Sequence, residues 1–161
     1  MATNTISNQG GGQSGNSPAP KRIVIFDDSR EALKRFVERL QGTAVELRMY
    51  RRPKLDDSIR EALQKFQPQL IVVGLLMGES REDGYKLIKQ LHEVDTLKDV
   101  PIVVCSKLIN DSDLGRKEKE RSLSTPGLVA AYGKIPNFPP AEELFRPLSD
   151  FQSCKARKRN E

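Results

Sequence analysis

Short apolar runs alternate with helix-like segments through most of the chain. The runs are rich in Ile and Val, the composition of strands that are covered on both faces of a sheet. They lie at 22–26, 44–50, 69–76, 100–105 and 127–132. Parallel strands need long crossover connections, and a helical pattern follows each run. The alternation therefore predicts an α/β fold, in which a five-stranded parallel sheet carries helices on both faces.

The helical patterns differ in how many apolar residues they contain. The first has Leu33, Phe36, Val37 and Leu40 at helical spacing, with Asp28 or Ser29 as the N-cap. The fourth, at 111–123, is mostly polar and has few apolar positions. The expected helices lie at 28–41, 56–67, 84–94, 111–123 and 140–151.

Composition separates the two ends of the chain from its middle. Residues 1–20 carry no charge and little that could pack, so we expect a disordered N-terminal tail. The formal charge of the chain is +5. Residues 21–150 hold 23 Lys and Arg against 21 Asp and Glu, whereas 151–161 hold four against one. We therefore expect one nearly neutral folded domain at 21–150 and a short basic tail at 151–161.

The sequence also argues against secretion, a membrane span, a disulfide framework and a cysteine metal site. Residues 1–20 lack the pattern of a signal peptide, and no window is long and apolar enough for a membrane span. Cys105 and Cys154 have neither the number of a disulfide framework nor the spacing of metal ligands. The expectation is a cytoplasmic protein with no membrane insertion. Four basic residues in a tail without interleaved aromatics do not predict nucleic-acid binding.

Polar residues follow three of the predicted strands, where an open α/β sheet places its functional loops. Asp27 and Asp28 come after the first strand, Ser106 after the fourth and Lys134 after the fifth. Adjacent carboxylates are ligands for a hard cation such as Mg²⁺. A serine hydroxyl and a lysine ammonium can bind phosphoryl oxygens. Each of these residues is ordinary at a strand end, and it is their combination that is informative.

The stretches "KRIVIFDDSREAL" and "VPIVVCSK", with the "DG" at Asp83–Gly84, resemble the receiver domain of two-component response regulators. The resemblance covers about 21–150. It implies a flavodoxin-like, three-layer order of the five strands. It also implies a phosphoacceptor aspartate at the end of the third strand, activated beside a bound Mg²⁺.

This chain departs from the receiver pattern at that acceptor. In "PQLIVVGLLMG" the acceptor position is occupied by Gly74, which has no oxygen to take a phosphoryl group. The next carboxylate along the chain is Glu79, in a loop about two residues longer than usual. The family's switch aromatic lies three residues before its lysine, whereas the candidate here, Tyr132, lies two before Lys134. Without an acceptor, the acidic pair Asp27 and Asp28 is at best a weak Mg²⁺ site, and we expect no cofactor.

These departures favour a degenerate receiver, or pseudo-receiver. Such a module would act in signal transduction by binding proteins, without enzymatic activity and independently of phosphorylation. Nothing after the last predicted helix could form a DNA-binding domain, so we expect a stand-alone module. Two alternatives stay open. One is a functional phosphoacceptor that uses Glu79 or a shifted aspartate, and the other is a flavodoxin-like domain that binds a small molecule.

The resemblance also indicates where a partner would bind. In the receiver family, partner contacts lie on the fourth helix, the fifth strand and the fifth helix. A signalling protein, either a histidine kinase or another regulator, is the expected partner. The candidate contact residues in that region are Arg116, Lys117, Lys119, Arg121, Tyr132 and Phe138.

Overall fold

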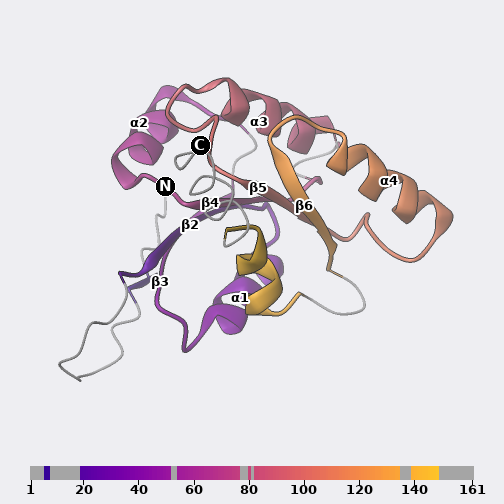
Figure 1. Ribbon diagram of the computed structural model, residues 1–161, viewed down its shortest axis with the longest axis horizontal. Coiled ribbons are helices and arrows are strands. Elements are labelled where there is room, and N and C mark those ends of the chain that lie inside the picture. Colours follow the sequence, from indigo (N-terminus) through magenta and orange to yellow (C-terminus); the bar gives the residue numbers. More distant parts are fainter. Residues whose placement is uncertain are drawn as a thin grey trace, which may run out of the picture.

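A computed structural model describes residues 6–7, 19–51, 54–76, 80, 82–134 and 139–148. Its strands form one sheet in the order β1-β3-β2-β4-β5-β6 (Figure 1). The last five of these are parallel to one another. The strands are β1 (Ile6–Ser7), β2 (Lys21–Phe26), β3 (Val45–Tyr50), β4 (Leu70–Val73), β5 (Ile102–Ser106) and β6 (Leu128–Gly133). The five parallel strands confirm the predicted sheet.

The central strands are buried because both faces of the sheet are covered. All the residues of β4 and of β5 are buried, as their continuous apolar runs predicted. One core cluster packs α2 (Asp57–Phe66) and α3 (Glu82–Glu93) against one face of the sheet. A second cluster packs α1 (Arg30–Leu40) and the helix at 141–148 against the other face. Figure 1 shows these helices as layers above and below the sheet.

Side-chain caps begin three of the four labelled helices. Ser29, not Asp28, caps α1, and its hydroxyl accepts a hydrogen bond from the backbone N–H of Ala32 at 3.2 Å. Asp56 caps α2 through the N–H of Ile59 at 2.8 Å. The carboxylate of Asp27 accepts the backbone N–H of Ser29 at 2.9 Å, directly before the helix.

The helix α4 (Asp113–Leu123) lies beside α3 and differs from the other helices in what it buries. Its buried residues are Gly115, Glu118 and Ser122, none of which has a large apolar side chain. Its two leucines, Leu114 and Leu123, are 78% and 47% exposed. The structure confirms the helix predicted at 111–123. Unlike the other helices, it turns polar side chains toward the domain.

The N-terminal segment contains a strand that the sequence did not predict. Ile6 and Ser7 pair antiparallel with Leu47 and Glu46 of β3. The expectation of a wholly disordered tail at 1–20 is therefore wrong for these two residues. Backbone pairing at a sheet edge needs no apolar side chain, which explains why composition missed it. Residues 1–5 and 8–18, and the predicted basic tail at 151–161, lie outside the described residues.

Among the helices that the structure describes, none is long and apolar enough to cross a lipid bilayer.

Candidate functional site at the carboxyl end of the sheet

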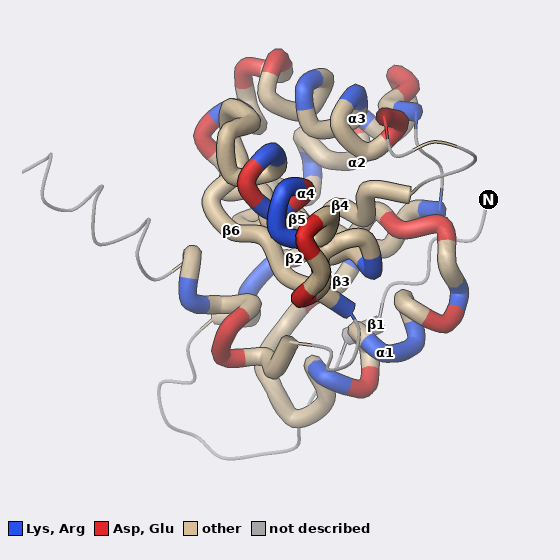
Figure 2. Tube along the Cα trace, turned by 90° about the vertical axis from the view of Figure 1, so that its right-hand side faces the viewer, with Lys and Arg blue, Asp and Glu red and all other residues tan. Residues whose placement is uncertain are grey.

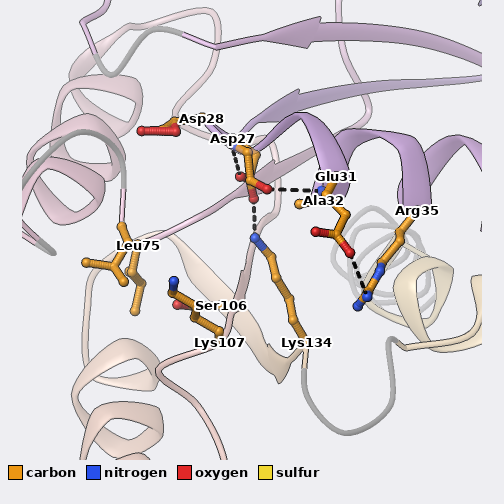
Figure 3. A pocket seen from close by; sticks show the side chains of 11 residues that line it. Asp27, Asp28, Glu31, Ala32, Arg35, Leu75, Ser106, Lys107 and Lys134 are labelled. Carbon is orange, nitrogen blue, oxygen red and sulfur yellow. Dashed lines mark hydrogen bonds and ion pairs between the residues drawn. The ribbon is translucent and has the colours of Figure 1, made fainter.

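The carboxyl ends of the parallel strands open into a pocket of about 480 Å³. Figure 3 shows that the side chains that line it come from the ends of different strands and from the start of α1. The structure thus brings together the four polar residues that the sequence singled out, namely Asp27, Asp28, Ser106 and Lys134.

Asp27 is the buried centre of this pocket, with 2% of its surface exposed. Its backbone N–H donates to the carbonyl of Tyr50 at 3.1 Å, which continues the pairing of β2 with β3. Its Oδ1 accepts from the backbone N–H of Ser29 at 2.9 Å. Its Oδ2 forms an ion pair with Nζ of Lys134, drawn as a dashed line in Figure 3. Both carboxylate oxygens of Asp27 therefore have partners within the chain.

Gly74 lies directly against that carboxylate. Its backbone N–H donates to the carbonyl of Phe26 at 2.9 Å, so β4 still runs alongside β2 at this point. A Cβ built on Gly74 would lie 2.8 Å from Oδ2 of Asp27 and 3.2 Å from its Cγ. Such contacts are too short for both groups to stay in place. The present position of the Asp27 carboxylate therefore depends on the absence of a side chain at residue 74.

Lys134 reaches the site in spite of the altered spacing to Tyr132. It follows β6 directly, and its backbone N–H donates to the carbonyl of Ser106 at 3.3 Å. Its side chain is mostly buried and crosses to Asp27 on β2's end. A buried ion pair of this kind is costly to break from one side, since the remaining charge has no partner. The pair therefore ties the end of β6 to the end of β2.

Ser106 ends β5 with its side chain buried at the pocket. Its hydroxyl oxygen accepts from the backbone N–H of Leu108 at 3.2 Å, which shapes the loop that leaves the strand. The preceding residue, Cys105, packs into the core on the α1 side. Burial raises the pKa of the Cys105 thiol to about 12. The thiol is therefore protonated at neutral pH and is no candidate nucleophile.

The rest of the pocket lining mixes charges of both signs. Its carboxylates come from Asp27, Asp28 and Glu31, and its cations are Arg35, Lys107 and Lys134. Glu31 and Arg35 pair with each other at 3.0 Å along α1. The guanidinium of Arg51 donates to the backbone carbonyl of Asp28 at 3.2 and 3.3 Å.

This arrangement does not fit a magnesium site. Mg²⁺ prefers one or two carboxylates whose oxygens face it, together with water and phosphate. Both oxygens of Asp27 are already bound, one of them by a lysine ammonium. Across the described part of the chain, no three Asp, Glu, His or Cys side chains gather closely enough to hold a metal ion. The weak Mg²⁺ site suggested by Asp27 and Asp28 therefore has no support in this geometry.

Tyr132, the candidate switch aromatic, lies on the α1 side of the sheet. Its ring packs with the core cluster of α1 and the helix at 141–148. Its hydroxyl donates to the carbonyl of Glu143 at 2.8 Å. Side chains alternate between the faces of a strand, so the neighbouring Ala131 points to the α3 side instead. The residue three before Lys134, on the face toward α3, is thus an alanine.

The other candidate contact residues lie on α4, except for Phe138, which is outside the described residues, as is Glu79. Lys117 and Lys119 are exposed, and Arg116 pairs with Asp113 one turn earlier. Figure 2, which looks onto α4, shows basic and acidic positions intermixed along this helix. Arg121 differs from the rest because Glu82 of α3 holds its guanidinium, with N–O distances of 2.9 and 3.0 Å.

Sequence reasoning missed a polar contact between α3 and α4. The hydroxyl of Tyr85 donates to Oε1 of Glu118 at 2.6 Å and lies 3.1 Å from the hydroxyl of Ser122. The guanidinium of Arg121 stacks over the Tyr85 ring, 4.1 Å from its centre. The spacing of Glu118 and Ser122, one helical turn apart, was the available signal, but it does not say which helix they face.

No family model and no curated protein matches the chain. Solved structures do match its fold. A signal receiver domain of an HD domain-containing protein from Pseudomonas fluorescens Pf-5 aligns with a TM-score of 0.65 and 16% identity, over 89% of this chain and 97% of that one. The BeF₃-activated receiver domain of Klebsiella pneumoniae RstA aligns with a TM-score of 0.59 and 22% identity, over 82% and 99%.

The chain has the receiver fold. A third receiver-fold neighbour, the Mn²⁺-bound form of response regulator Rcp1, aligns with a TM-score of 0.51 and 20% identity, over 83% and 93%. At these identities the likeness establishes the fold and leaves the chemistry of the site to its residues. The receiver fold explains why the polar residues after β2, β5 and β6 meet at one edge.

Proposed function

We propose that this protein is a receiver-fold signalling module that acts by binding another protein and accepts no phosphoryl group. The observation that carries the proposal is the contact between Gly74 and Asp27. A receiver acceptor would need a carboxylate at residue 74, and the Asp27 carboxylate occupies the space that its Cβ would require. Lys134, the cation that would face a phosphoryl group, is paired with Asp27 instead.

We also propose that the protein binds no divalent metal ion at this site, because Lys134 is paired with Asp27 and residue 74 is a glycine. A divalent ion would have to displace Lys134 from Asp27 and would find no carboxylate at residue 74. Mn²⁺ is bound in the Rcp1 neighbour, but here both carboxylate oxygens of Asp27 already have partners, Ser29 and Lys134. We expect millimolar Mg²⁺ to leave the melting temperature of the protein unchanged.

Exposure to a small phosphodonor tests the proposal directly. The full chain is incubated with acetyl phosphate and Mg²⁺, and its intact mass is measured under conditions that preserve acyl phosphates. No mass increase is expected. A phosphoryl adduct on the wild-type chain, mapped to Asp27, Asp28 or Glu79, would instead support the rival function, a phosphoacceptor with a shifted carboxylate.

A pair of substitutions at residue 74 separates the acceptor from the rest of the site. Gly74→Asp supplies a carboxylate and forces the Asp27 side chain to move, which frees Lys134. Gly74→Ala causes the same crowding without the carboxylate. We expect an adduct only in Gly74→Asp, and none in Gly74→Ala or the wild type.

The surface of α4 and β6 supports the protein-binding part of the proposal. The large apolar side chains that are exposed in the described residues are Leu114 and Leu123 of α4 and Val129 of β6. Exposed apolar residues with basic residues on the same element are found at interfaces. Lys117 and Lys119 provide the basic residues, so we infer a signalling partner with an acidic contact surface.

A charge-reversal comparison tests this surface. Lys117→Glu with Lys119→Glu changes the outer side of α4, and Arg60→Glu with Lys65→Glu makes an equal change on α2. All four side chains are exposed, so neither pair should affect folding by more than about 1 kcal/mol. In a pull-down with the full chain as bait, the α4 pair should lose a bound protein that the α2 pair retains. Loss with the α2 pair alone would place the contact surface elsewhere.

A further inference from the structure

The attachment of α4 is unusual because its inner side is polar. Apolar burial usually holds a helix to a domain, and polar contacts contribute less net free energy. In α4 the leucines face outward, while Glu118 is buried at 7% exposure. The helix also lies against β6, but it contributes no large apolar side chain there, so specific hydrogen bonds and ion pairs replace a packed apolar stripe.

Those contacts form one connected cluster, which we call the α3–α4 clasp. It consists of Glu82 and Tyr85 on α3 and Glu118, Arg121 and Ser122 on α4. Tyr85 stands at its centre, with its hydroxyl between Glu118 and Ser122 and its ring beneath the guanidinium of Arg121. Burial and the hydrogen bond to Glu118 raise the pKa of Tyr85 to about 12, so its hydroxyl stays protonated and remains a donor at neutral pH.

The clasp is independent of the pocket residues. None of its five members lines the pocket, and its contacts join two helices on one face of the sheet. On β6, where an aromatic could have packed toward α4, Ala131 offers only a methyl group and Tyr132 lies on the other face. The aromatic contact of α4 thus comes from α3.

We propose that α4 is a releasable helix, which the α3–α4 clasp holds in place and which can detach while the rest of the domain stays folded. Detachment removes little apolar surface from the core, because α4 contributes no large apolar side chain to either core cluster. The released form is a minor population, about 0.1–10% of molecules. The clasp thereby sets how often the α4 surface changes shape, without any input from the pocket.

Native-state hydrogen exchange of the full chain tests the proposal. Tyr85→Phe keeps the ring and removes only the hydroxyl, which leaves the buried Glu118 carboxylate without that donor. Amides of α4 should then exchange about tenfold to a hundredfold faster, while those of α1 and the central strands keep their wild-type rates.

Tyr50→Phe is the matched control for this substitution. Tyr50 is also partly buried in the same core cluster, but its hydroxyl has no hydrogen-bond partner in the described part of the chain. Removing that hydroxyl should leave exchange from α4 unchanged. Faster α4 exchange in both variants would mean that loss of any core hydroxyl loosens this helix. That result would contradict the proposal that the α3–α4 clasp holds α4 in place.

Two further variants keep the test decisive if Tyr85→Phe folds poorly. Arg121→Gln removes the ion pair to Glu82 and should also speed α4 exchange. Arg116→Gln should not, because the guanidinium of Arg116 bonds to Asp111 and Asp113, at the start of α4 and in the loop before it, and not across to α3 in the described residues. The double variant Tyr85→Phe with Glu118→Leu replaces a polar pair with an apolar one and should restore slow exchange.

The proposal fails if Tyr85→Phe and Arg121→Gln both leave α4 exchange at the wild-type rate. It also fails if every helix accelerates together with α4, since the clasp would then support the whole domain and α4 would not detach by itself. These readouts do not depend on a partner or a phosphodonor, so they stand apart from the tests of the proposed function.

Discussion

The helices α1 and α4 have the same length and the same kind of N-cap, yet they are attached to the domain in opposite ways. Each has 11 residues and begins at a serine whose hydroxyl accepts a backbone N–H three residues on. The inner side of α1 carries Leu33, Phe36 and Leu40. Burying one such side chain stabilises a fold by about 1.5–3 kcal/mol, whereas a typical hydrogen bond contributes about 0.5–1.5 kcal/mol.

The difference shows that a helix can form without being firmly fixed. Local signals such as caps and ion pairs along the helix decide whether a segment is helical, and α4 has these signals. What the helix presents to its neighbours decides how tightly it is held. We therefore expect substitutions in α1 to affect the whole domain and substitutions in α4 to affect α4 alone.

Phe36→Ala should give the largest effect. Phe36 is almost fully buried, so its truncation should lower the free energy of unfolding by about 3–5 kcal/mol. Urea unfolding followed by circular dichroism measures this loss. Leu114→Ala is the control on α4 and should change stability by less than about 0.5 kcal/mol. Similar losses in the two variants would show that the two helices are attached alike.

Gly115→Ala should give the next effect, confined to α4. A Cβ on Gly115 would come within 2.6 Å of the backbone of Asn110, in the loop before the helix. Overpacking of this kind costs about 1–3 kcal/mol, which exceeds the gain of about 1 kcal/mol in helix propensity. Hydrogen exchange should accelerate in 113–123 and not in 30–40. Lys119→Ala, on the exposed side of the same helix, should leave both regions unchanged.

Loss of the two serine caps should show its cost in different places. Ser29→Ala and Ser112→Ala each remove a capping hydrogen bond worth about 1 kcal/mol, and Ser112→Ala also removes the bond that its hydroxyl donates to Asn110. For Ser29 the loss should lower the melting temperature of the domain. For Ser112 it should accelerate α4 exchange and leave the melting temperature almost unchanged. A clear drop in melting temperature with Ser112→Ala would argue that α4 unfolds only together with the core.

Cys105 offers the most sensitive check, because no reaction is expected in the intact protein. At pH 8 a thiol with a pKa of about 12 is ionised in about one molecule in ten thousand, and Cys105 is also buried on the α1 side. In a Cys154→Ser background, iodoacetamide should leave the native chain unmodified. Phe36→Ala should make Cys105 reactive, and Tyr85→Phe should not.

The sequence predicted the parallel sheet and the residues that meet at the carboxyl ends of its strands. Apolar runs marked the five parallel strands, and the carboxyl ends of those strands meet by geometry. The meeting of Asp27, Asp28, Ser106 and Lys134 in one pocket could therefore be anticipated. The position of Gly74 at the end of β4 followed from the same alignment of strands.

What the sequence could not supply were contacts that depend on how side chains turn. Tyr132 and Ala131 are adjacent, and a one-residue difference decides which face of β6 carries the aromatic ring. The choice of Asp27 as the partner of Lys134 depends on space that only the folded chain defines. Tyr85 and Glu118 are 33 residues apart on different helices, and no local pattern links them.

The short strand β1 has a consequence for any shortened version of this protein. The two core clusters that the structure describes consist of residues between Ile23 and Phe145, so a chain that starts at residue 19 should melt within about two degrees of the full chain. That chain would, however, present β3 as an open row of backbone donors and acceptors to other molecules. Light scattering that increases with protein concentration would reveal such edge-to-edge association of the sheets. The two residues of β1 would then serve to keep separate molecules apart rather than to hold one molecule together.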